Sequence, residues 1–323
     1  MRIHLIQLFE ETVSRFPEKT AVIDKDRSIS FSDLRQKAVQ TAATIALKGI
    51  PQNRPIGVFL DKSIESVYAD LGILYAGDFY MNLDIKTPAE RIKNILQLTE
   101  PAAIISTSIQ IKSIAAVIPD SVKLILLDEL DTEMAIDGQM LSNRRATVID
   151  TDPSCIINTS GSTGTPKGVV LNHKSFFDFL DWAIETFRFG NDLVMGSLSP
   201  IVFDIYSFEL CMLMAKASTL VVLPAHLAAF PAKILEVLEK HQVNFLFWVP
   251  TIMVNIANMD LLSAFKLESL RTVWFAGEVF PTKQFNYWHH HLPKVVFANL
   301  YGPIEITIDC TYYIITKEIT DEE

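Results

Sequence analysis

Residues 158–168 read NTSGSTGTPKG, a run of small and hydroxyl-bearing side chains between the apolar stretches 155–157 and 169–171. Gly, Ser and Thr allow successive backbone N–H groups to converge on one point as an anion-binding nest, and Lys167 adds positive charge. A polyphosphate is the ligand that such a loop favours. A solvated hairpin loop without any ligand is the alternative for a glycine-rich stretch.

This stretch does not match the Walker A phosphate loop. That pattern requires a lysine followed by Ser or Thr at the start of a helix. Here Lys167 is followed by Gly168 and by apolar residues that predict a strand.

On both sides, strand-like and helix-like segments alternate, which predicts βαβ units and parallel sheets. Helical spacing of apolar residues predicts a first helix over 5–16, and Ser32 is expected to cap the next one. Predicted strands before the loop are 20–24, 29–31, 55–60, 79–84, 102–107 and 122–128, with helices over 63–77 and 87–100. Expected strands over 154–160 and 167–172 flank the loop, and further strands follow over 219–224, 244–250, 272–278 and 294–302, with helices from about Ser175 and over 231–242 and 281–291.

Residues 131–150 lose this periodicity and gain charge, so they are the expected connection between two units, 1–150 and 151–323. A chain of 323 residues with 49% hydrophobic side chains can bury a core in each. Its 38 acidic and 28 basic residues form no basic block, which argues against nucleic acid and anionic membranes as partners.

Three separated cysteines, Cys155, Cys211 and Cys310, argue against a disulfide framework and indicate a reducing compartment. The first 16 residues do not resemble a signal peptide, and no uncharged apolar run is long enough to span a membrane. We therefore expect a cytoplasmic protein.

The string TSGSTGTPKG resembles the phosphate-binding signature of the adenylate-forming superfamily, which includes acyl-CoA synthetases, luciferases and amino-acid adenylation domains. Four further stretches resemble that family's motifs in the same order: ISFSDL (29–34), LYAGDFYMNLDIKTPAERIKNIL (74–96), SPIVFDIYSFEL (199–210) and NLYGPIE (299–305). The stretch FAGEVFP (275–281) is most similar to amino-acid adenylation domains, including ligases that charge a carrier protein with D-alanine.

The resemblance implies two doubly wound, mostly parallel sheets flanked by helices, plus a smaller β-barrel-like element. It implies ATP and AMP as bound nucleotides, with Mg²⁺ held by Glu305 through a hard carboxylate oxygen. The implied phosphate-binding residues are Thr159, Ser160, Gly161, Ser162, Thr163, Gly164 and Lys167. The implied adenine-binding residues are Gly277, Glu278, Val279, Asn299 and Tyr301, whose flat ring and amide suit a purine.

Asp204 matches the aspartate that pairs with the α-ammonium group of an amino acid in adenylation domains. A solvated or capping aspartate is the alternative. The other implied pocket residues are Ile205, Phe208, Thr251, Trp274, Ala276, Leu300, Ile308 and Asp309. Trp274 would favour a small or flat side chain and Asp309 a cationic or polar one, so the amino acid is left open.

Two departures from the family pattern stand out. Ile304 replaces the usual Thr, which removes a hydroxyl expected near the α-phosphate. The chain also stops shortly after NLYGPIE, whereas the family continues into a small C-terminal domain that carries a lysine for the adenylation step. We expect an N-terminal piece of a longer enzyme that loads aminoacyl groups onto a carrier-protein thiol, with that domain as a partner. No catalytic residue is expected within this chain.

The histidines His289, His290 and His291 follow one another on a predicted helix, so they point about 100° apart and do not converge on a metal. His173 is expected to be structural. Two other functions are open from the residues: a nucleotide- or amino-acid-binding module without turnover, and a ligase that joins an acyl or aryl acid to CoA.

Overall fold

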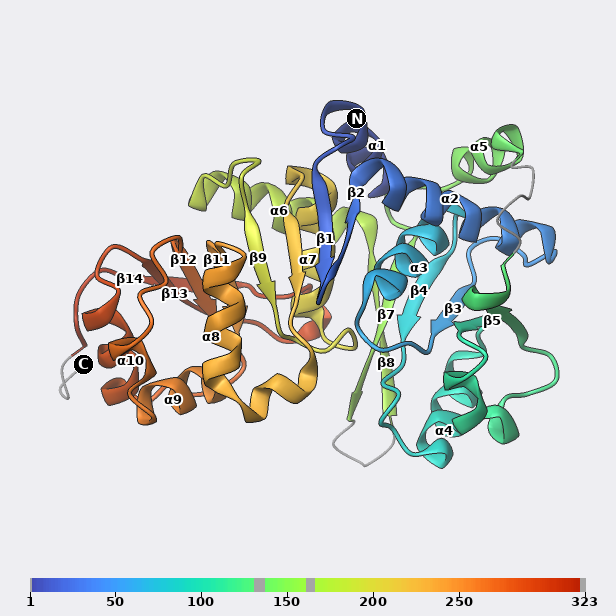
Figure 1. Ribbon diagram of the computed structural model, residues 1–323. Coiled ribbons are helices and arrows are strands. Elements are labelled where there is room, and N and C mark those ends of the chain that lie inside the picture. The colour runs from blue at the N-terminus through green and yellow to red at the C-terminus, as the bar shows by residue number, and fades with distance from the viewer. Residues whose placement is uncertain (1, 131–136, 161–165, 320–323) are drawn as a thin grey trace.

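The computed structural model describes residues 2–130, 137–160 and 166–319, without the side chains of Ser160 and Pro166. Two twisted sheets lie next to each other, with helices packed over their faces (Figure 1). One sheet has eight strands in the order β14-β13-β12-β11-β9-β10-β1-β2, and the other has six in the order β6-β5-β3-β4-β7-β8. The expected α/β architecture is confirmed.

The six-stranded sheet is parallel except for its last pair, because β7 and β8 run antiparallel. Its inner strands β3, β4 and β5 are buried along their whole length, as expected for a parallel sheet covered on both faces. Its strands are β3 (Pro55–Val58), β4 (Phe79–Asn82), β5 (Ala103–Ser106), β6 (Lys123–Leu126), β7 (Pro153–Ser160) and β8 (Pro166–Asn172). The helices of this region are α2 (Phe31–Leu47), α3 (Ile64–Tyr75), α4 (Ala89–Thr99) and α5 (Gly138–Ala146).

The eight-stranded sheet is parallel in its centre, and the edge strands β2 and β14 each run antiparallel to a neighbour. Its strands are β1 (Thr20–Asp24), β2 (Arg27–Ser30), β9 (Val194–Ser197), β10 (Thr219–Val222), β11 (Phe245–Trp248), β12 (Thr272–Phe275), β13 (Val296–Tyr301) and β14 (Thr311–Ile315). The remaining α-helices are α1 (Ile6–Arg15), α6 (His173–Phe187), α7 (Asp204–Lys216), α8 (Pro231–Lys240), α9 (Pro250–Asn258) and α10 (Thr282–His291). Short 3₁₀ helices cover Gln110–Ser113, Ala115–Val117, Leu127–Glu129, Ala225–Ala229, Leu261–Ser263 and Ile304–Ile306.

The two sheets exchange strands between the halves of the sequence. Strands β1 and β2 come from the first 30 residues but join the sheet of the second half through β10. Strands β7 and β8 come after residue 150 but join the first-half sheet through β4. The expected unit boundary at residue 150 therefore does not coincide with the division between the sheets.

Three local expectations were wrong or incomplete. Among the described residues every strand belongs to one of the two open sheets, so no separate barrel-like element occurs. Ser30, not Ser32, caps α2, because the Ser30 Oγ accepts a hydrogen bond from the Asp33 N–H at 3.1 Å. The expected connection 131–150 contains α5, and its residues 131–136 lie outside the described ranges.

The helix α7 had no counterpart among the predicted elements. All residues from Ile205 to Met214 are buried, so the helix has no apolar stripe that would mark it as amphipathic. It packs against α1 and α6 within the main hydrophobic core. Within the described part of the chain, no helix combines the length and hydrophobicity needed to cross a membrane.

Candidate nucleotide and amino-acid site

A pocket of about 600 Å³ opens at the carboxyl ends of β9, β11, β12 and β13. Parallel strands end at the same edge of a sheet, so the segments that follow them meet there. The walls contain Leu198, Ser199, Pro200, Phe203, Asp204, Ile205, Ala225, Ala228, Phe247, Trp248, Val249, Thr251, Ile252, Asn255, Ala276, Gly277, Glu278, Gly302, Ile308 and Asp309. Eight expected site residues are among them: Asp204, Ile205, Thr251, Ala276, Gly277, Glu278, Ile308 and Asp309.

Asp204 is the first residue of α7 and is mostly shielded from water. Its Oδ1 accepts a hydrogen bond from the Ile205 N–H at 2.9 Å. Burial raises the pKa of the Asp204 carboxyl to about 6. Hydrogen bonds from the backbone N–H groups of Ile205 and Asp204 lower this pKa, but by less. None of the ion pairs among the described residues includes Asp204. Its carboxylate therefore faces the pocket without a cation.

Asp309 brings a second carboxylate to the same pocket. Its Oδ2 atom is buried and has no hydrogen-bond partner. Burial raises the pKa of the Asp309 carboxyl to about 7, and the negative charge of Asp204 contributes to the same shift. The preceding residues Thr307 and Ile308 have φ values of 69° and 67°, which are unusual for β-branched side chains.

Three of the expected pocket residues lie behind the pocket wall. Phe208, Trp274 and Leu300 are buried in the main core. The Trp274 ring stacks on Phe208 at 5.1 Å between centroids, and its buried Nε1 has no hydrogen-bond partner. Trp274 was expected to fill part of the pocket, but it is not among the residues that line the pocket.

Two of the five expected adenine-binding residues line the pocket, and the other three are exposed and outside its lining. Gly277 has φ of +85°, a conformation that favours glycine, and Glu278 follows it in the wall. The Glu278 Oε2 accepts hydrogen bonds from the Thr251 N–H and hydroxyl at 2.9 and 2.5 Å. Val279, Asn299 and Tyr301 are exposed, and Tyr301 lies next to the pocket residue Gly302. The exposed ring of Tyr301 and the exposed amide of Asn299, both in β13, suit a flat base.

The stretch that was expected to bind phosphate begins in β7 and ends in β8. Thr159 and Lys167 are paired across this hairpin, and Lys167 is exposed. Gly161, Ser162, Thr163 and Gly164 lie outside the described residues, as does the side chain of Ser160. An antiparallel hairpin that ends in small residues is compatible with the expected anion-binding nest.

Glu305 is exposed in the turn Ile304–Ile306, and Ile304 is packed against the main core. The described residues contain no group of three or more His, Cys, Asp or Glu side chains that could hold a metal. A magnesium ion at Glu305 would thus need oxygen ligands from bound phosphates.

His173 lies in the buried contact between α1 and α6. Its Nδ1 accepts a hydrogen bond from the Leu5 N–H at 3.4 Å. Burial lowers the pKa of His173 to about 3. These contacts are compatible with the structural role that was expected.

Sequence reasoning missed a buried polar network that attaches α7 to the six-stranded sheet and its helices. Tyr206 donates to Asp70 Oδ2 at 2.9 Å, and Asn82 Nδ2 donates to the same oxygen at 3.2 Å. Lys62 Nζ donates to the backbone oxygens of Ser197 and Ser199, while the Ser197 hydroxyl donates to Glu209. The one available signal was the acid Glu209 within an otherwise apolar helix.

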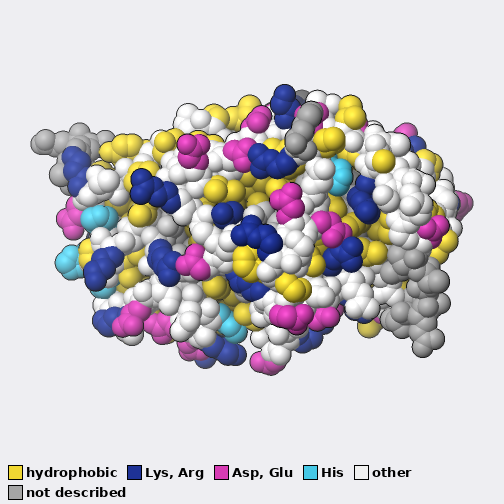
Figure 2. All heavy atoms as spheres, turned by 90° about the horizontal axis from the view of Figure 1, so that it is seen from above, with side chains coloured by type: hydrophobic (Ala, Val, Ile, Leu, Met, Phe, Trp, Pro, Cys, Tyr) yellow, Lys and Arg dark blue, Asp and Glu magenta, His cyan; other side chains and the backbone are white. Residues whose placement is uncertain are grey.

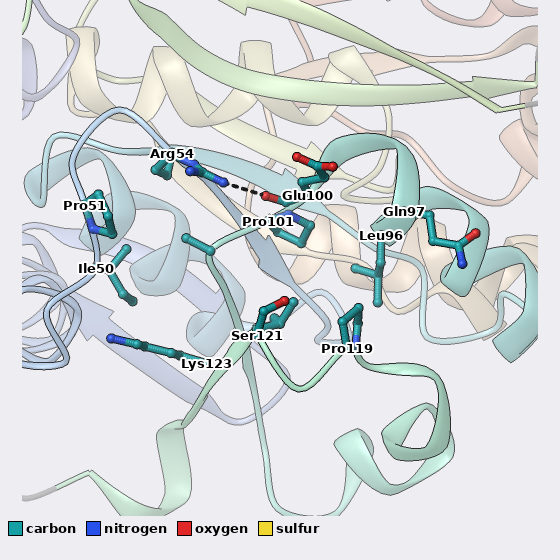
Figure 3. A pocket seen from close by; sticks show the side chains of 12 residues that line it. Ile50, Pro51, Arg54, Leu96, Gln97, Glu100, Pro101, Pro119, Ser121 and Lys123 are labelled. Atoms are coloured by element: carbon teal, nitrogen blue, oxygen red, sulfur yellow. Dashed lines mark hydrogen bonds between the residues drawn. The ribbon is translucent and has the colours of Figure 1, made fainter.

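A second pocket, of about 500 Å³, lies at the amino ends of β3, β5 and β6 in the six-stranded sheet. Its lining residues are drawn in Figure 3. Arg54 and Lys123 line it, and Arg54 Nη2 donates to the Glu100 carbonyl oxygen at 3.1 Å. None of the expected site residues lies there. Basic and acidic side chains are interspersed on the face seen in Figure 2, which shows no continuous basic patch on that face.

Comparison with known families and structures agrees with this geometry. The model of the AMP-binding enzyme family matches residues 9–323. This chain belongs to the AMP-binding enzyme family. It is 29% identical over 307 residues to tyrocidine synthase 1 of Brevibacillus parabrevis, covering 95% of this chain and 27% of that protein. It is 26% identical to an L-proline–[L-prolyl-carrier protein] ligase of Pseudomonas fluorescens, covering 94% and 61%.

The fold matches solved structures of nonribosomal peptide synthetases. The α-methyl-L-serine-AMP bound form of the synthetase FmoA3 superposes with a TM-score of 0.87 at 21% identity, covering 98% of this chain and 35% of that one. The chain spans less than two thirds of the length of the curated relatives named above.

Proposed function

We propose that this chain is the substrate-binding part of an amino-acid adenylation enzyme, which forms aminoacyl-AMP and pyrophosphate from an amino acid and ATP. The observation that carries the proposal is the Asp204 carboxylate, shielded in the pocket and without a cationic partner. A buried carboxylate is costly unless a cation pairs with it. The α-ammonium group of an amino acid supplies that cation.

The proposed reaction needs no nucleophile from the protein. A carboxylate oxygen of the amino acid attacks the α-phosphorus of ATP, an O–P bond forms, and the bond to pyrophosphate breaks. The chain's contribution is to orient the two substrates and to neutralise charge. A carrier-protein thiol then attacks the acyl carbon, forms a thioester and releases AMP.

The roles of the other residues follow from their positions. Tyr301, Asn299 and the Gly277–Val279 segment form the adenine rim, and the hairpin from Thr159 to Lys167 binds the β- and γ-phosphates. Glu305 is the proposed Mg²⁺ ligand next to those phosphates. The carrier protein, a further C-terminal domain and a cytoplasmic location are parts of the same proposal, supported by a carrier-protein ligase among the relatives.

Two other functions predict different outcomes. A ligase for acyl or aryl acids has no use for a carboxylate at Asp204, so it would activate acids without an α-amino group. A binding module without turnover would bind nucleotide and amino acid but would never exchange pyrophosphate into ATP.

The test is amino-acid-dependent exchange of pyrophosphate into ATP by the full-length protein. We expect exchange with a subset of amino acids and none with their desamino analogues. Asp204→Ala should reduce exchange at least about 30-fold, the size expected for stranding one buried charge, while leaving ATP binding intact. Activation of a desamino acid at the same rate would refute the proposal in favour of an acyl or aryl ligase.

A further inference from the structure

The pocket contains a second carboxylate that the proposed function leaves without a role. Asp309 Oδ2 is buried and unpaired, and none of the ion pairs in the described part of the chain includes Asp309. An amino acid with a neutral side chain would neutralise Asp204 and leave Asp309 without a partner. Stranding a charged group in a desolvated pocket is strongly unfavourable.

The other residues of the pocket wall do not offer a partner. The described lining residues include no Lys, Arg or His, so no protein cation faces Asp309 across the pocket. The third acid of the wall, Glu278, is bonded to Thr251 and adds further negative charge. The local charge balance therefore favours a ligand with more than one positive group.

The space next to Asp309 favours a cation as well. Asp309 also lines a neighbouring hollow of about 320 Å³, whose wall includes Asp178, Trp182 and Tyr312. The Trp182 and Tyr312 rings pack against each other with centroids 4.9 Å apart. Aromatic faces and an additional carboxylate attract an ammonium or guanidinium group.

We infer, on the basis of the proposed function, that the pocket selects an amino acid whose side chain carries a second cation. Asp204 pairs with the α-ammonium group, and Asp309 pairs with an ammonium or guanidinium group at the end of the side chain. A neutral polar side chain that accepts a hydrogen bond from a protonated Asp309 is the competing possibility. The presence of two carboxylates in one pocket wall favours the dication, because each positive group relieves the repulsion between them.

The test compares basic amino acids with uncharged isosteres of the same length. The pairs are 2,4-diaminobutyrate with norvaline, ornithine with norleucine, and lysine with 2-aminoheptanoate. Binding to the full-length protein is measured by calorimetry in the presence of AMP, and arginine and glutamine complete the panel. In at least one pair, the basic member should bind about 30-fold or more tightly than its isostere, or arginine should exceed glutamine by that factor.

The variant Asp309→Asn keeps the side-chain size but removes the charge. It should abolish the preference for the basic member and bind the isostere more tightly than the unaltered protein does, because no charge is then left without a partner. Asp120→Asn is the matched control, because Asp120 is an exposed acid outside the pocket. The basic amino acids and their isosteres are also compared on the unaltered protein, so the test remains valid if a variant fails to fold.

The outcomes separate this inference from the proposed function. If an isostere or glutamine binds as tightly as the basic amino acids, the inference is wrong, while amino-acid binding that requires Asp204 still supports adenylation. If no amino acid binds or supports pyrophosphate exchange, the proposed function fails and the inference fails with it.

Discussion

Gly302 lies against the backbone that carries Asp309. A Cβ atom at this position would be 2.4 Å from the Asp309 Cα and 2.9 Å from the Cys310 nitrogen. Both contacts are with backbone atoms, so the segment itself would have to move. Gly302 therefore fixes the approach of this pocket segment to the end of β13.

We expect Gly302→Ala to destabilise the protein by about 1–3 kcal/mol, as overpacking does, and to weaken amino-acid binding by displacing Asp309. Urea unfolding and calorimetry measure the two effects. Gly138→Ala is the control, because a Cβ at Gly138 has no neighbour within 4 Å. Unchanged unfolding and binding in Gly302→Ala would contradict the close approach.

At the residue scale, motif matches named eight of the residues that line the pocket, including Asp204 and Asp309, and their roles in binding stay predictions. They placed Trp274 and Phe208 in the wall, whereas both rings lie in the aromatic core. The difference arises because a motif gives position along the chain, while packing of several rings around Trp274 decides which side chains reach the surface of the pocket. The interactions of Lys62 depend on segments more than 130 residues away, so no local pattern predicted them.

The helix α7 begins with Asp204 and is held by polar contacts along its buried face. Tyr206 reaches Asp70 on α3, Ser207 Oγ accepts from the Tyr80 hydroxyl at 3.1 Å, and Glu209 accepts from Ser197 at the end of β9. These contacts tie the pocket carboxylate to both sheets. Since each of these groups is buried, loss of a partner leaves the other unsatisfied.

The Asp70 carboxyl at the end of this network makes stability depend on pH. Burial raises its pKa to about 7 in the folded protein, above the ordinary value of 3.8. The folded state therefore holds the proton more tightly than the unfolded state, and the free energy of unfolding falls as the pH rises from about 4 to 7. This loss is complete above the folded pKa.

We expect Asp70→Asn, which is neutral at every pH, to gain stability relative to the parent protein as the pH rises from 4 to 8. Urea unfolding at several pH values measures the difference, on the order of 1 kcal/mol or more. Asp128→Asn should show no such trend between pH 4 and 8, because hydrogen bonds from Ser108 lower the pKa of the Asp128 carboxyl and confine its effect on stability to pH values below the ordinary 3.8. A pH-independent difference between Asp70→Asn and the parent would refute this assignment.

At the element scale, most amphipathic helices and short apolar strands were predicted with nearly correct bounds, whereas α7, α9, β9 and β14 were missed. The helix α7 is buried on all sides, and β9 has only four residues. Neither carries a periodic contrast between polar and apolar faces. Such elements are stabilised by their neighbours rather than by a local pattern.

At the scale of the whole molecule, both sheets take strands from both halves of the sequence. The strand β1 pairs with β10, and β4 pairs with β7. Local signals predicted the alternation of strands and helices but not this exchange, because strand partners are set by long-range packing. A cut at residue 150 consequently removes neighbours from both sheets.

We expect fragments 1–150 and 151–323, produced separately, to show no cooperative unfolding transition. Each fragment would expose strand edges and apolar core surface that the intact chain covers. Thermal melting followed by near-ultraviolet circular dichroism measures this, with the intact chain as control. A sharp melting transition in either fragment would show that half of the sequence folds alone.

The pairing of β1 with β10 also has a consequence for synthesis of the protein. Strand β1 ends at Asp24 and β10 begins at Thr219, which is 195 positions further along the chain. At about 5–20 residues per second, the ribosome takes roughly 10–40 s to add that length of chain. During this interval the β1–β2 hairpin has no parallel neighbour, so the backbone hydrogen-bonding groups along the free edge of β1 stay without their strand partner.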